Sequence, residues 1–146
     1  MEKIKLRLLR DSSKSPTYGS DFSAGADIYA DIENELVIPP HSTAFVPSGF
    51  ALAIPHGYVG LVCARSGLAC KRHLAPANKV GVIDADYRGE VLVALHNHSE
   101  EAAVIQPSER IAQLLIVPVM APGFELTDSL PETDRGEGGF GSTGKL

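Results

Sequence analysis

Residues 50–64 read FALAIPHGYVGLVCA and contain two strand patterns joined by a turn. Phe50, Leu52 and Ile54 alternate with alanines, and the alternation resumes after Pro55-His56-Gly57. A period of two puts every second side chain on the same face of a strand, whereas helical faces repeat with a period of 3.6. This stretch therefore predicts two β-strands, each with at least one buried face.

The same alternation recurs elsewhere in the chain, at residues 4–8 and 91–96. Proline and glycine punctuate the sequence at short intervals, for example at Pro47-Ser48-Gly49 and Pro122-Gly123. Many short strands separated by turns predict an all-β subunit, either an antiparallel sandwich, a jelly roll or a barrel. Only Ser66–His73 has a helical composition, and Ser66 is its candidate N-cap.

The character of the chain changes after about Asp128. Residues 129–146 contain few apolar side chains, and five glycines lie between Gly136 and Gly144. Such a segment has little to bury. We therefore expect a β-rich core domain over residues 1–128 and a mobile, flexible C-terminal arm over residues 129–146.

Composition excludes some partners. The 146 residues carry a formal net charge of −5, and no run of Lys and Arg exceeds two, so a nucleic-acid strand is disfavoured. No apolar run approaches the roughly 20 residues of a membrane helix, and residues 1–6 alternate charged and apolar side chains, unlike a secretion signal. The sequence predicts a cytoplasmic protein that binds neither nucleic acid nor membrane.

The two cysteines, Cys63 and Cys70, are expected to be buried or half-buried thiols. A zinc site needs more ligands at close spacing, and a lone disulfide needs an oxidising compartment.

Residues 139–146, GFGSTGKL, come close to a phosphate-binding loop of the pattern G-x-x-x-x-G-K-[ST]. The residue after Lys145 is Leu146 rather than a hydroxyl residue, no strand leads directly into the segment, and no helix follows it. A P-loop is therefore rejected. The glycines still allow backbone N–H groups to converge on an anion, and Phe140 could stack on a ligand base.

Four other segments have both a structural and a functional interpretation. The segment at 81–89, GVIDADYRG, is either a plain hairpin turn or a turn that presents a carboxylate and a tyrosine to a ligand. The segment at 64–69, ARSGLA, is either an ordinary helix start or an anion site. Residues 23–29 and 107–114 are weak signals by themselves.

Together and in this order, five segments resemble the five motifs of the trimeric dUTPases. They are Ala24-Gly25-Ala26-Asp27, Arg65-Ser66-Gly67-Leu68-Ala69, Gly81 to Gly89, Glu109-Arg110-Ile111-Ala112-Gln113-Leu114 and Arg135 to Gly144. The resemblance implies a jelly-roll-like subunit, a homotrimer with active sites at subunit interfaces, and Mg2+ as cofactor. The implied reaction hydrolyses dUTP to dUMP and pyrophosphate, which limits uracil in DNA and supplies dUMP for dTMP synthesis.

The resemblance also implies roles for individual residues. Asp84 is expected to deprotonate the water that attacks the α-phosphorus. Tyr87 is expected to pack under the deoxyribose, Asn78 to read the uracil edge, and Asp27 to hold a magnesium-bound water in the second shell. Phosphate contacts are expected from Arg65, Ser66, Gln113, Arg135, Ser142 and Thr143, and stacking on uracil from Phe140. Gly67 and Gly141 are expected to bind the substrate as well.

Three alternatives remain open at this stage. A dCTP deaminase shares the fold, but it needs a glutamate beside the base, and Glu90 does not stand at a position to which we assign that role. A non-catalytic nucleotide-binding trimer would not require Asp84. A purely structural β-sandwich with a flexible tail would not explain why the five motifs occur in this order.

Overall fold

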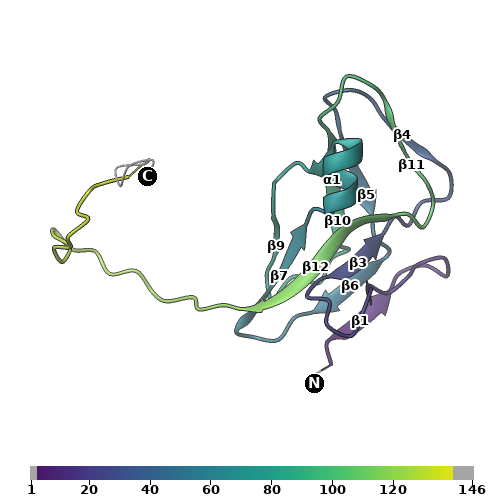
Figure 1. Cartoon of the computed structure of the whole chain (residues 1–146). Coiled ribbons are helices and arrows are strands. Elements are labelled where there is room, and N and C mark those ends of the chain that lie inside the picture. The colour runs from purple at the N-terminus through teal and green to yellow at the C-terminus, as the bar shows by residue number, and fades with distance from the viewer. Residues whose placement is uncertain (1–2, 140–146) are drawn as a thin grey trace.

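The computed structural model describes residues 3–139 and consists mainly of β-strands (Figure 1). The strands are β1 (Lys5–Leu8), β2 (Thr17–Tyr18), β3 (Ala26–Tyr29), β4 (Leu36–Ile38), β5 (Thr43–Pro47), β6 (Phe50–Ala53), β7 (Tyr58–Cys63), β8 (Leu74–Pro76), β9 (Gly81–Ile83), β10 (Leu92–Asn97), β11 (Ala103–Ile105) and β12 (Arg110–Pro118). One helix, α1 (Ser66–Arg72), follows β7. The all-β fold with one short helix is confirmed.

The largest sheet has the strand order β2-β3-β12-β7-β9, and all its strand pairs are antiparallel. This order places β3, β12 and β7 side by side although they are far apart in the sequence. Gln113 of β12 pairs with Asp27 of β3 on one side and with Cys63 of β7 on the other. The pairing brings three of the five sequence motifs to one region of the sheet.

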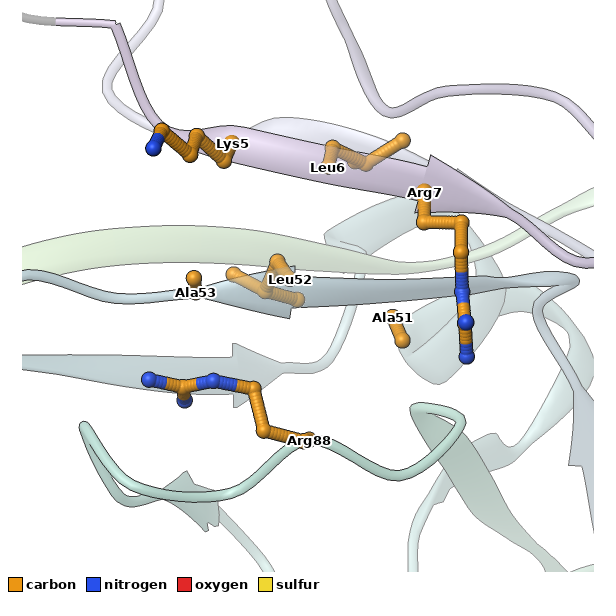
Figure 2. A pocket seen from close by; sticks show the side chains of 7 residues that line it. All are labelled: Lys5, Leu6, Arg7, Ala51, Leu52, Ala53 and Arg88. Atoms are coloured by element: carbon orange, nitrogen blue, oxygen red, sulfur yellow. The ribbon is translucent and has the colours of Figure 1, made fainter.

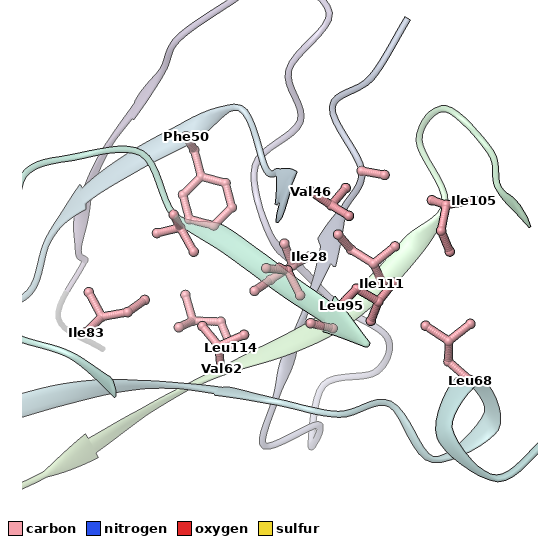
Figure 3. Packing of buried hydrophobic residues seen from close by; sticks show 14 of the residues in the cluster. Ile28, Val46, Phe50, Val62, Leu68, Ile83, Leu95, Ile105, Ile111 and Leu114 are labelled. Atoms are coloured by element: carbon pink, nitrogen blue, oxygen red, sulfur yellow. The ribbon is translucent and has the colours of Figure 1, made fainter. Parts of the chain in front are cut away.

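The hydrophobic core draws side chains from all four sheets and from α1 (Figure 3). The five-stranded sheet contributes residues such as Ile28, Val62 and Leu114, and the sheet β5-β10-β8 contributes Val46 and Leu95. Phe50 of β6 is fully buried, as the alternation in residues 50–54 predicts. Packing between sheets is therefore the main source of burial for the β-strands.

The expectation of a buried face is wrong for β1. All four of its residues are exposed, and Leu6 and Leu8 keep 37% and 47% of their surface. β1 pairs only with β6, in a two-stranded sheet. Alternation thus predicted the strand correctly, but it could not show whether a second layer lies over either face.

Helix α1 begins as predicted, but Ser66 is not its N-cap. Arg65 takes that position, with an extended backbone, because its carbonyl accepts the bond from Ala69 N at 2.9 Å. No side chain caps the helix, so the Ser66 hydroxyl stays exposed. Within residues 3–139, the structure has no helix long and apolar enough to cross a membrane.

Both cysteines are free thiols, and their burial differs. Cys63 is half-buried on β7, whereas Cys70 is exposed, contrary to expectation. Cys70 lies on α1, whose single buried residue is Leu68, so one short face of the helix contacts the core and the rest meets solvent.

The part of the chain after β12 leaves the core (Figure 1). Residues 119–139 contain no helix or strand, and all but Gly138 are exposed. Val119 N still donates to Gly57 O at 2.9 Å, but side-chain hydrogen bonds further along, such as Arg135 Nε to Gly138 O at 2.7 Å, are local. We call residues 119–139 the arm; its irregular structure begins about ten residues before the expected boundary at 129.

Asp31, between β3 and β4, ties its own loop to the loop at residues 10–13. Its carboxylate is 5% exposed and accepts hydrogen bonds from Arg10 Nε at 2.6 Å, Ser13 Oγ at 2.8 Å and Ser12 Oγ at 3.0 Å. Burial alone raises the pKa of Asp31, but the bonds from Ser13, Arg10 and Ser12 outweigh burial and hold that pKa below its ordinary value of 3.8.

This pKa predicts an acid-sensitive contribution to stability. Because the folded pKa of Asp31 is lowered, its stabilisation is fully present above the unfolded pKa and is lost as pH falls through the folded pKa. Asp31→Asn should lower the free energy of unfolding at pH 7 by about 1–3 kcal/mol. The difference in free energy of unfolding between the variant and wild type should become smaller below pH 3.8, the ordinary pKa of aspartate. Urea unfolding at a series of pH values measures both effects, with Asp11→Asn, an exposed carboxylate in the Arg10–Ser13 loop, as control. A stability difference that stays constant with pH would contradict the lowered pKa of Asp31.

Candidate functional site

A first pocket, which we call the arginine pocket, lies where β3, β7 and β12 meet. It has a volume of ≈ 440 Å³. Its lining includes the predicted site residues Asp27, Arg65, Ser66, Gly67 and Gln113, together with Arg110. The structure thus brings the first, second and fourth motifs together in one chain.

Asp27 lies between two arginines in this pocket. Its Oδ1 accepts from Arg65 Nε at 2.7 Å, and its Oδ2 is 3.2 Å from Arg110 Nη1. The Asp27 side chain is 14% exposed, and the two arginines are 28% and 53% exposed. Two guanidinium groups against one carboxylate leave a surplus of positive charge. An open pocket with such a surplus suits a phosphorylated ligand.

Gln113 is held by the strands around it. Its Nε2 donates to Ala64 O at 2.8 Å, just before Arg65. Its side chain fills the space beside Gly25, where an added Cβ would lie 2.4 Å from Gln113 Oε1. A side chain added at Gly25 would displace the Gln113 amide, so the glycine of the first motif leaves room for the glutamine of the fourth.

A second pocket, the Asp84 pocket, lies at the end of β9 and has a volume of ≈ 230 Å³. Its lining includes Asn78, Asp84, Tyr87 and Glu90. Asp84 directly follows β9, and Tyr87 N donates to its backbone carbonyl at 3.1 Å, which closes a tight turn. The Asp84 carboxylate is left exposed in the pocket.

The Tyr87 ring packs against the same turn. Its hydroxyl donates to the Glu90 carbonyl at 2.9 Å, and the ring lies over Gly89, where an added Cβ would be 2.4 Å from the Tyr87 oxygen. Tyr87 still exposes 46% of its surface. One face of the ring is therefore available to a ligand.

The two pockets have no lining residue in common. Asp84, Asn78 and Tyr87 are thus not in the same pocket as Arg65 and Gln113. A third hollow, between β1 and β6, is lined by Lys5, Arg7 and Arg88 over an apolar floor and contains none of the predicted site residues (Figure 2).

The predicted residues of the fifth motif are placed only in part. Arg135 lies in the arm, outside both pockets, and its guanidinium bonds to Gly138 O. Phe140, Gly141, Ser142 and Thr143 lie outside the described residues.

Sequence reasoning assigned no role to two residues that line the pockets. Arg110 belongs to the fourth motif, and its contact with Asp27 depends on the pairing of β3 with β12 and on a bulge between Arg110 and Ala112. Glu90 follows the turn, and its carboxylate accepts from Gly49 N at 2.8 Å and from Arg10. Neither contact leaves a local sequence signal.

The residues present fit a magnesium ion only through water. Within residues 3–139, no group of three or more His, Cys, Asp and Glu side chains could hold a metal. Asp27 offers hard oxygen donors of the kind magnesium prefers, but both oxygens already accept bonds from arginines. Such a site suits an ion bound mainly by a ligand's phosphates.

Comparison with known proteins agrees with this geometry. The dUTPase family model matches residues 11–144. A deoxyuridine 5'-triphosphate nucleotidohydrolase of Syntrophotalea carbinolica is 48% identical over 141 residues, covering 97% of this chain and 96% of the relative. Another, from Desulfitobacterium hafniense, is 48% identical over 145 residues with the same coverage.

Solved structures show the same fold. A mutant dUTPase of Staphylococcus bacteriophage 80alpha with dUpNHpp has a TM-score of 0.86 and 28% identity, covering 99% of both chains. A mutant dUTPase from phage phi11, described with a structural Mg(II) ion, has a TM-score of 0.78 and 27% identity, covering 88% of this chain and 98% of that one. The fold and the relatives together define an all-β nucleotide hydrolase. The chain belongs to the dUTPase family.

Proposed function

We propose that this chain hydrolyses dUTP to dUMP and pyrophosphate with Asp84 as its general base. As a dUTPase it is a dUTP diphosphatase. One observation supports the residue assignment: the chain has two complementary pockets. One holds an exposed carboxylate beside a half-exposed tyrosine ring, and the other holds a surplus of arginine charge.

In the proposed reaction, the Asp84 carboxylate accepts a proton from water, and the water oxygen attacks the α-phosphorus. The bond between the α-phosphorus and the oxygen that bridges to the β-phosphorus breaks, so that pyrophosphate leaves. A carboxylate within hydrogen-bond range of the water suits this step. Arg65, Ser66, Gly67 and Gln113 bind phosphate oxygens, while Asn78 reads the uracil and Tyr87 packs against the deoxyribose.

Magnesium completes the proposed site. Asp27 would reach the ion through water, in keeping with its two arginine contacts, and the substrate's phosphates would supply the direct ligands. When bound, the ion would neutralise charge on the triphosphate.

We further propose that three copies assemble and share each active site. The proposal is supported by the separation of the arginine pocket from the Asp84 pocket, because a neighbouring copy can place one against the other. The arm supports it as well: beyond Val119, its described hydrogen bonds join arm residues to one another. The arm and the residues after it can therefore extend to another subunit, where Arg135, Phe140, Gly141, Ser142 and Thr143 would close over the nucleotide.

The activity is tested by measuring pyrophosphate release from dUTP, dTTP, UTP and dCTP, with magnesium and with EDTA. We expect turnover of dUTP about 100-fold above that of UTP, which is the usual discrimination of a packed apolar surface against an added hydroxyl. EDTA should abolish most of the activity. Ammonia release from dCTP, in place of pyrophosphate from dUTP, would instead indicate a deaminase; the engagement of Glu90 by Arg10 and Gly49 disfavours that outcome.

A further inference from the structure

Glu90 connects the turn of the Asp84 pocket to a distant loop. Its Oε1 accepts hydrogen bonds from Gly49 N at 2.8 Å and from Arg10 Nη2, and its Oε2 is 3.4 Å from Arg10 Nη1. Arg10 therefore grips both carboxylate oxygens in a forked contact. We call the pair of Arg10 and Glu90 the clamp.

The outer end of the clamp is firmly anchored. Arg10 Nε donates to the buried carboxylate of Asp31 at 2.6 Å. Gly49 has a φ of +77°, and an added Cβ would lie 2.3 Å from Asp31 Oδ2, so only glycine fits between the two carboxylates. Leu9 N also donates to Gly49 O at 2.8 Å. The loop that carries Arg10 is thus fixed to the body of the domain.

The inner end of the clamp is the backbone against which Tyr87 packs. The Tyr87 hydroxyl donates to the carbonyl of Glu90, and the ring covers Gly89. Val91, the next residue, enters the core and donates its N–H to Phe50 O at 3.0 Å. The core thus holds one side of this peptide unit and the clamp holds the Glu90 side chain on the other. Without the clamp, only Val91 would fix the carbonyl that contacts the Tyr87 hydroxyl.

We propose that Arg10 and Glu90 are positioning residues for the Tyr87 ring, and that their contact determines how strictly the Asp84 pocket excludes a 2′-hydroxyl. The inference rests on the proposed function, in which Tyr87 packs against deoxyribose. The Arg10 side chain is 43% exposed, and ion pairs with an exposed partner contribute little to stability. We therefore expect loss of the clamp to change selectivity more than stability.

The test measures kcat and KM for dUTP and UTP in Arg10→Met and Glu90→Gln. Each variant should lower the ratio of kcat/KM for dUTP to that for UTP by about tenfold, because displacement of a positioned group by a fraction of an ångström weakens discrimination. Most of the loss should come from a higher KM for dUTP and a lower KM for UTP, with kcat for dUTP within about threefold of wild type. The double variant should be no less selective than either single variant, since both remove one contact.

Two controls separate positioning from general loosening. Arg72→Met removes another arginine–carboxylate pair, with Glu109, and neither residue lines the arginine pocket or the Asp84 pocket. Asp11→Asn changes an exposed carboxylate next to Arg10 that takes no part in the clamp. Both should keep wild-type selectivity, even where the melting temperature falls. Arg10→Lys should restore only part of it, because an ammonium lacks the fork.

The outcomes are distinct. Unchanged selectivity in Arg10→Met and Glu90→Gln, with a discriminating wild type, overturns the clamp and leaves the proposed function intact. Equal losses of selectivity in Arg72→Met would also overturn it, since selectivity would then follow general stability rather than the contact between Arg10 and Glu90. A wild-type protein that releases no pyrophosphate from dUTP would refute the proposed function itself. Should Arg10→Met fail to fold, Glu90→Gln still decides, because glutamine can accept the Gly49 bond.

Discussion

Asp84→Asn is expected to lower kcat for dUTP by a factor of about 10² to 10⁴, the usual contribution of a positioned general base. Asparagine has the shape of aspartate but cannot take a proton from water. The backbone carbonyl that accepts from Tyr87 N is unchanged, and no hydrogen bond of the described residues involves the Asp84 carboxylate. The turn should therefore keep its geometry, and binding of a non-hydrolysable dUTP analogue should stay within about threefold of wild type.

Single-turnover release of pyrophosphate measures the chemical step, and calorimetry with the analogue measures binding. Asp86→Asn is the matched control: it makes the same change in charge two residues further along the same turn, at an exposed position that does not line the Asp84 pocket. A wild-type kcat in Asp84→Asn would remove the general-base assignment. Equal losses in the two variants would show that the net charge of the turn, rather than one carboxylate, is what matters.

The local structure was largely predictable because a strand follows from the alternation of neighbouring residues in the sequence. The alternation in residues 50–64 predicts β6, the turn and β7, and the composition after Arg65 predicts α1 to within one residue of its end. Burial was less predictable. β1 has the same alternation as β6 yet is exposed, because burial depends on which element covers a strand, and that is decided by the whole fold.

The arrangement of the site was predictable only in part. Five motifs identify residues but give no order of strands, and it is the order β3-β12-β7 that puts Asp27, Arg65 and Gln113 in one pocket. The same topology leaves Asp84 in another pocket. Arg10 was missed for a related reason: it lies in a loop about 80 residues before Glu90, and no local pattern records so distant a contact.

Deleting residues 135–146 is expected to lower kcat/KM for dUTP by at least about 100-fold without unfolding the β domain, because a missing lid leaves phosphate groups and the base without contacts. Among the described residues, the side-chain hydrogen bonds of residues 127–139 join arm residues only to one another. The truncation therefore removes none of these bonds from the core. The melting temperature should therefore match wild type. Glu132→Gln, an exposed arm position just before the deletion, serves as a control that should keep full activity. An unchanged kcat/KM in the truncated protein would refute the lid.

The truncated chain also makes the shared site testable. Chains carrying Asp84→Asn keep an intact arm, and truncated chains keep Asp84, so neither is active alone. Equal amounts refolded together should form mixed trimers in which about one quarter of the sites combine Asp84 from one subunit with an arm from another. Activity should therefore return toward that fraction of wild type. If each arm instead closes over the Asp84 of its own chain, every site lacks one of the two, and the mixture should stay as inactive as its components. Because both components share the same β domain, the difference between these results depends only on which chain supplies the arm.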